Sequence, residues 1–159
     1  MAWIFSLSAE CGALRQDAEI FRDYFQGLTL TLSDGKEIQC SADTYSQDRD
    51  GNWWTIVIPE GMVIGRGDDL TLRKKERASE VGFLLYDYLK AAPPFRYAMV
   101  GLEVDGFMEE SEFKTFDWRI YDGIVLSKDF CEKLNCQNEF DQFTQDYYWR
   151  PYLGEKEDL

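Results

Sequence analysis

Residues 28–61 read "LTLTLSDGKEIQCSADTYSQDRDGNWWTIVIPEG", and this stretch decides the fold that the sequence predicts. Apolar and polar residues alternate on both sides of Asp34–Gly35, a dipeptide that favours the tight turn of a β-hairpin. A second turn at Asp48–Asn52 precedes a run of β-branched and aromatic residues. We therefore expect a meander of three antiparallel strands. The predicted strands are Leu28–Leu32, Ile38–Ala42 and Trp53–Pro59.

The segments on either side of this meander predict strands and helices in mixed order. Alternation in "AWIFSLSAE" indicates a first strand with one buried face. Apolar residues at a four-three-four spacing from Leu14 to Phe25 indicate an amphipathic helix, and a second helix is expected from about Thr71 to Lys90. The other expected elements are a buried strand at Phe95–Val104, a strand within Arg119–Ser127, a short helix after Ser127 and a last helix from Glu139 to about Tyr148.

This order of elements predicts an α+β fold, in which helices pack mainly on one face of a largely antiparallel sheet. A chain of 159 residues fits a single domain spanning 1–159, and the polar tail from about 154 to 159 is expected to fray. The hydrophobic share of 45% is large enough to form a core, so the net charge of -13 does not indicate disorder.

The chain lacks the sequence features of a signal peptide and of a membrane-spanning helix. Its first apolar run is short and has no basic flank, and no later run has the necessary length. We therefore expect a cytoplasmic protein without a membrane partner. In that compartment cysteines are usually reduced, so all four are expected to be free thiols. They are Cys11, Cys40, Cys131 and Cys136.

Few residues of the chain point to catalysis. The sequence has no histidine, so a base active near neutral pH would have to be a carboxylate, a lysine or a thiolate. A zinc site would need thiolates from distant segments, and we expect no metal and no cofactor. The alternative hypothesis is an enzyme or a small-ligand-binding domain, and it depends on one pair of carboxylates. Glu103 and Asp105 are alternate residues at the end of a predicted strand and could share a pocket.

The net charge of -13 favours a basic protein as the partner. Nucleic-acid binding requires a basic surface, and the one basic run, Arg73–Arg77, has Glu76 and Glu80 beside it for ion pairs along a helix. Opposite surface potentials speed the encounter of an acidic protein with a basic one. Our hypothesis is a non-enzymatic acidic protein that binds a basic protein. Immunity-type inhibitors, which are small acidic proteins that neutralise basic toxins, are an example of this general class of protein.

The C-terminal stretch "FDQFTQDYYWRPYLG" is rich in aromatic residues. On the predicted last helix, Phe140, Phe143 and Tyr147 share one stripe and belong to the core. The aromatic residues that follow do not fit this stripe, and they either fold back over the sheet or face a partner, since Tyr and Trp are enriched at interface hot spots. The predicted partner-binding residues are Tyr148, Trp149 and Tyr152, with the acidic residues Glu109, Glu110 and Glu112.

Overall fold

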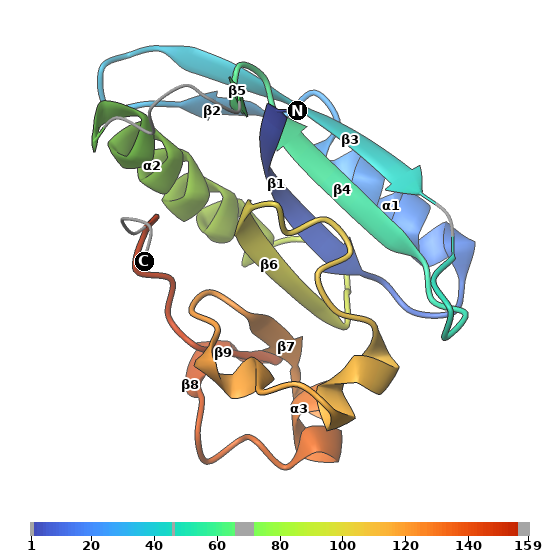
Figure 1. Cartoon of the computed structure of the whole chain (residues 1–159). Helices are drawn as coiled ribbons and strands as arrows, with labels where there is room; N and C mark the ends of the chain where they lie inside the picture. The colour runs from blue at the N-terminus through green and yellow to red at the C-terminus, as the bar shows by residue number, and fades with distance from the viewer. Residues whose placement is uncertain (1, 46, 66–71, 156–159) are drawn as a thin grey trace.

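The computed structural model describes residues 2–45, 47–65 and 72–155, and it confirms an α+β fold with one antiparallel sheet (Figure 1). The sheet order is β2-β3-β4-β1-β6-β7-β9-β8, and β5 pairs with β1. The strands are β1 (Ala2–Glu10), β2 (Thr29–Thr31), β3 (Glu37–Tyr45), β4 (Trp54–Pro59), β5 (Val63–Gly65), β6 (Tyr97–Leu102), β7 (Val125–Ser127), β8 (Asp141–Thr144) and β9 (Tyr147–Trp149). The helices are α1 (Arg15–Phe25), α2 (Leu72–Leu89) and α3 (Lys128–Leu134), with 3-10 helices at Glu110–Lys114 and Trp118–Ile120.

Strand β1 lies at the centre of the sheet and is buried on both faces. Leu7 lies opposite Val57 of β4 and Val100 of β6, and all three side chains are buried. The sequence predicts one buried face for this strand, but the polar side chains of the other face are fully buried as well. The difference arises from the tertiary structure, because the chain between β6 and β7 covers that face. These polar residues are Ser6, Ser8 and Glu10.

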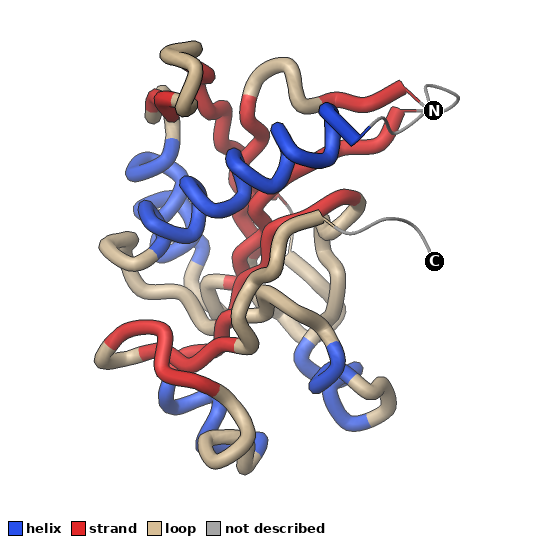
Figure 2. The backbone as a smooth tube through the Cα atoms, turned by 90° about the vertical axis from the view of Figure 1, so that its left-hand side faces the viewer, coloured by secondary structure: helices blue, strands red, loops and turns tan. Residues whose placement is uncertain are grey.

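Two hydrophobic cores lie on opposite faces of the sheet. The first core joins α1 and α2 to the face of β1 that carries Leu7. The second core contains Trp54 and Tyr97, which lie opposite Glu10 on the neighbouring strands, together with Phe130 of α3. Figures 1 and 2 place the two long helices in the upper part of each view and the short helical segments at the lower end.

The segment after Asn138 differs from the sequence prediction, because it forms the β8–β9 hairpin and no helix. Strand β9 pairs with β7, and this edge offers backbone hydrogen bonds that a helix could not use. Phe140 and Phe143 are buried as predicted. However, they belong to the second and the first core respectively.

Two further expectations are corrected by the structure. Cys131 and Cys136 form a disulfide, whereas Cys11 and Cys40 are buried free thiols. Asn135 adopts a left-handed conformation at the end of α3, which turns the chain and brings the two bonded cysteines together. Leu14, which was expected on the buried stripe, precedes α1 and is 65% exposed.

Tyr86 of α2 connects the helix to the sheet on the first face. Its hydroxyl donates a hydrogen bond to the carbonyl oxygen of Gly123 at 2.5 Å and accepts one from the amide nitrogen of Val100 at 3.0 Å. The side chain is only 2% exposed, so neither backbone group has water as a replacement partner.

Replacing Tyr86 with Phe should therefore lower the free energy of unfolding by about 3 kcal/mol, because two buried backbone groups lose their partner. Urea denaturation measures this change. The control is Tyr121→Phe, which removes a hydroxyl from a side chain that is 42% exposed and should leave stability nearly unchanged. Equal losses in the two variants would contradict the assignment.

Candidate functional site

The chain between β6 and β7 forms an excursion, residues 105–123, that folds over the second face of the sheet. It contains both 3-10 helices and is fastened by buried side chains. Phe113 and Trp118 pack into the second core, and the Tyr97 hydroxyl of β6 donates to the Met108 carbonyl oxygen at 2.7 Å. The excursion is therefore a fixed part of the fold.

The turn between β3 and β4 holds the start of the excursion from one side. Arg49 donates to Glu109 from its backbone nitrogen at 3.2 Å and from its Nε at 2.7 Å. Asp50 accepts a hydrogen bond from the backbone nitrogen of Ser111 at 2.9 Å. Arg49 is 79% exposed, so these contacts contribute modestly to stability and mainly set the position of the first 3-10 helix.

A chain of charged side chains holds the excursion from the other side, and we call Glu10, Arg96, Glu110 and Lys133 the charge chain. Arg96 lies 3.0 Å from a carboxylate oxygen of Glu10 and 3.0 Å from one of Glu110. Lys133 of α3 contacts Glu110 at 2.6 Å. The Glu10 side chain is fully buried, and its second oxygen accepts a hydrogen bond from the Gly12 nitrogen. The charge chain thus connects β1, β6, the excursion and α3.

The two carboxylates of the charge chain differ in their pKa. Burial raises the pKa of Glu10 from 4.5 to about 7, because the loss of water outweighs the attraction of Arg96 and the hydrogen bond from Gly12. Asp48 and Glu110 raise it further by repulsion. For Glu110, partial burial also acts to raise the pKa, but the hydrogen bonds from Lys133 and Arg96 outweigh it and lower the pKa.

The predicted acidic residues lie together at the start of the first 3-10 helix, but each makes contacts inside the fold. Glu109 contacts Arg49, and Glu112 accepts a hydrogen bond from the Glu109 nitrogen at 2.7 Å. Glu110 belongs to the charge chain. All three are half-buried, so their charges act first on their own chain.

The predicted aromatic residues pack against the two cores. Tyr152 is 5% exposed, and its ring centroid lies 4.9 Å from that of Tyr86. Trp149 is half-buried and packs against Tyr86 and Phe143 of the first core. Tyr148 is also half-buried and packs against the second core. The structure therefore does not gather these three side chains on one surface.

Sequence reasoning missed three exposed apolar side chains, which we call the apolar triplet: Phe116, Ile120 and Tyr121. They are 57%, 60% and 42% exposed. All three belong to one six-residue stretch of the excursion, residues 116–121. The sequence carries a weak signal, because apolar residues in this segment follow neither a helical nor a strand period.

The alternative carboxylate pair lies in the turn after β6, and both side chains are exposed. Glu103 has a left-handed backbone with φ of 55° and accepts a hydrogen bond from the Ile4 nitrogen at 3.1 Å. It lines a cavity of about 520 Å³ together with Asp122 and Glu155. Asp105 does not line this cavity, so the two carboxylates do not share one enclosed site.

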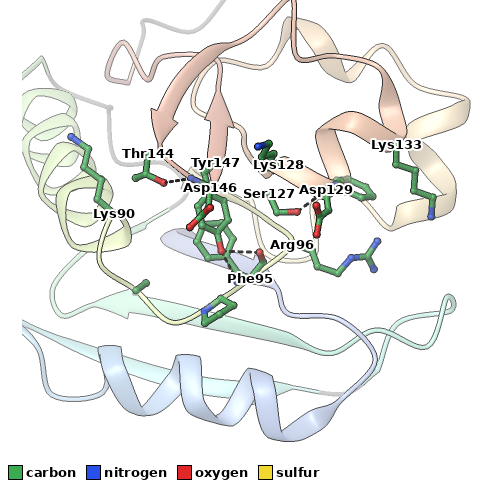
Figure 3. A pocket seen from close by; sticks show the side chains of 13 residues that line it. Lys90, Phe95, Arg96, Ser127, Lys128, Asp129, Lys133, Thr144, Asp146 and Tyr147 are labelled. Carbon is green, nitrogen blue, oxygen red and sulfur yellow. Dashed lines mark hydrogen bonds between the residues drawn. The ribbon is translucent and has the colours of Figure 1, made fainter.

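A cavity of about 730 Å³ lies between the end of α2, α3 and the β8–β9 turn (Figure 3). Arg96 and Lys133 line it, but both contact Glu110, and the Tyr147 hydroxyl exchanges hydrogen bonds with the backbone of Phe95. Arg96 and Lys133 are therefore balanced within the fold by Glu110. The charged residues that line it are Lys90, Arg96, Lys128, Asp129, Lys133 and Asp146.

The part of the chain that the structure describes contains no group of His, Cys, Asp and Glu residues able to hold a metal ion. In the same part, no helix combines the length and the apolar character needed to cross a bilayer. Comparison with protein families, curated proteins and solved structures finds no match to this chain. Function is therefore inferred from the chain's own residues.

The raised pKa of Glu10 predicts that stability depends on pH. Between pH 4.5 and about 7 the folded state holds a proton on Glu10 that the unfolded state has lost, so the free energy of unfolding falls as pH rises through this range. Wild type should lose about 3 kcal/mol more than Glu10→Gln between pH 5 and pH 8. Chemical denaturation of both proteins across this range measures the difference, and parallel pH profiles would refute the prediction.

Proposed function

We propose that this chain is a non-catalytic binding protein that holds a basic protein through the surface of the excursion. The observation that carries the proposal is the exposed apolar triplet on a segment that buried side chains anchor, in a strongly acidic chain. Exposed apolar side chains that lie together, rimmed by polar ones, are typical of protein interfaces.

The anchoring of the excursion favours binding, because little order must be created when a partner arrives. Phe113 and Trp118 pack into the second core, and the exposed triplet lies on the second 3-10 helix and on the residues on either side of it. A preorganised surface loses less conformational entropy on binding than a flexible one. Burying Phe116 and Ile120 in a partner would contribute most of the affinity, as large side chains do at interface centres.

The charges near the apolar triplet favour a basic partner. Asp117 is exposed inside the triplet, while Arg119 and Arg150 of this region are occupied by Glu139 at 2.6 Å and Asp122 at 2.9 Å. These two arginines are therefore balanced, and the net charge of -13 gives the chain a negative long-range field. Such a field steers a basic protein toward the surface and opposes an acidic one.

The predicted residues take different roles in this proposal. Tyr148 and Trp149 stay candidates for contacts at the margin, while Tyr152 acts through the core. Glu109, Glu110 and Glu112 set the position of the excursion and add to its field. An immunity-type inhibitor, which must cover a basic toxin without catalysing a reaction, would use a surface of this kind.

The test compares capture of basic proteins from lysate of the source organism by wild type and by a Phe116→Ser plus Ile120→Ser variant. A basic protein that wild type retains at low salt should be lost from the variant, because the apolar contacts are removed. The matched control is Leu14→Ser plus Ile20→Ser on the α1 side, where the side chains are 65% and 47% exposed. The control should retain the protein.

Kinetics with the purified partner separate the two contributions. Phe116→Ser should raise the dissociation rate about tenfold or more, whereas Asp117→Asn should mainly slow association, and only at low salt. Capture that is equal for all variants, or no basic protein retained at low salt, would overturn the proposed function.

A further inference from the structure

The structure assigns Glu10 and Arg96 a positioning role: together they hold the excursion in place, and the protonation of Glu10 sets how firmly it is held. This inference rests on the proposed function for its biological meaning, since the excursion carries the proposed binding surface. Its structural part can be tested on the free protein.

Arg96 bridges Glu10 and Glu110. Glu10 ends β1 with a fully buried side chain, and Arg96 directly precedes β6. One guanidinium nitrogen of Arg96 contacts Glu10, and the other contacts Glu110, each at 3.0 Å. The guanidinium also lies over the Phe130 ring, 4.9 Å from its centroid. Arg96 is thus held from three directions and is a fixed link between the sheet and the excursion.

From this link the chain leads to the exposed surface. Glu110 begins the first 3-10 helix, whose next buried residue is Phe113. The second 3-10 helix follows, and the apolar triplet is carried by this helix and by the residues on either side of it. The contact of Arg96 with Glu110, together with that of Lys133, therefore helps to fix the start of the excursion that carries the triplet.

The charged groups that act on Glu10 come from every element packed around it: Arg96 before β6, Asp48 from the turn after β3, and Glu110 from the excursion. Tyr97 and Cys11 also lie close enough for an ionised Glu10 to raise their pKa values. Among these groups only Arg96 attracts an ionised Glu10, whereas Asp48 and Glu110 repel it.

The coupling between Glu10 and Glu110 is reciprocal. Burial is the largest cause that disfavours the ionised form of Glu10, and repulsion by Glu110 adds to it, so ionised Glu10 in turn disfavours the position of the excursion that supplies both. Protonation of Glu10 removes this opposition. The excursion is therefore held more firmly at pH 6 than at pH 8, and the binding surface is better preorganised at the lower pH.

Hydrogen exchange with mass spectrometry tests the inference on the free protein. After correction for the intrinsic effect of pH, peptides from residues 105–123 should exchange about threefold faster at pH 8 than at pH 6. Peptides from α1 should show no such change. Glu10→Gln keeps the shape of the side chain without its charge, so its excursion should exchange slowly at both pH values.

The matched control is Glu37→Gln, which removes the same charge from an exposed position on β3 and should behave as wild type. In wild type, NMR titration should give the Glu10 carboxyl carbon and the Phe113 amide the same midpoint. This measurement decides the question even if Glu10→Gln does not fold. Any of three results would overturn the inference. The excursion of Glu10→Gln could show the same pH dependence of exchange as wild type, or the wild-type excursion could show none. The third is that the Glu10 carboxyl carbon and the Phe113 amide titrate with different midpoints.

Binding measurements distinguish this inference from the proposed function. If a basic partner binds through the apolar triplet while the exchange rate of the excursion does not change with the protonation of Glu10, only the positioning role is refuted. If the exchange rate of the excursion changes with the protonation of Glu10 and no basic partner is retained, the proposed function is refuted and the positioning role is supported.

Discussion

Burial of β1 on both faces is the constraint on which the rest of the structure depends. One face is apolar, and α1 and α2 cover it in the usual way for an α+β fold. The other face carries Ser6, Ser8 and Glu10, whose side chains are removed from water. Buried polar groups need hydrogen-bond partners, and a buried carboxylate also needs a cation or a proton. The chain after β6 meets much of this need.

The excursion and its neighbours supply partners for Ser8 and Glu10, whereas the buried Ser6 hydroxyl has no hydrogen-bond partner among the described residues. The Ser8 hydroxyl accepts a hydrogen bond from the Gly106 nitrogen at 3.2 Å, at the point where the excursion starts. Glu10 forms an ion pair with Arg96, and Arg96 in turn forms an ion pair with Glu110 and positions it. Aromatic packing around Tyr97 then closes the second core beneath the excursion, with ring centroids of Phe113 and Phe130 within 5.0 Å. The polar face of one strand therefore explains why a long connection folds back over the sheet.

The same arrangement divides the acidic residues of the chain into two groups. Some carboxylates, including Glu110, balance cations within the fold and contribute little to the external field. Others, such as Asp117, face the solvent beside exposed apolar side chains. Net charge describes their sum, and in the proposed binding of a basic protein the second group would supply the attraction.

The sequence by itself determined the local features of this protein. The turn at Asp34–Gly35, the alternation in β1 and the stripe of α1 depend on neighbouring residues, so their periods could be read directly. Tertiary structure decided the remainder. The β8–β9 segment paired with β7 because a strand edge was available, and Cys131 met Cys136 because Asn135 turned the chain. Which side chains stay exposed, as in the apolar triplet, and which charges become buried, as in Glu10, depend on packing between distant segments, and this packing leaves no periodic signal in the sequence.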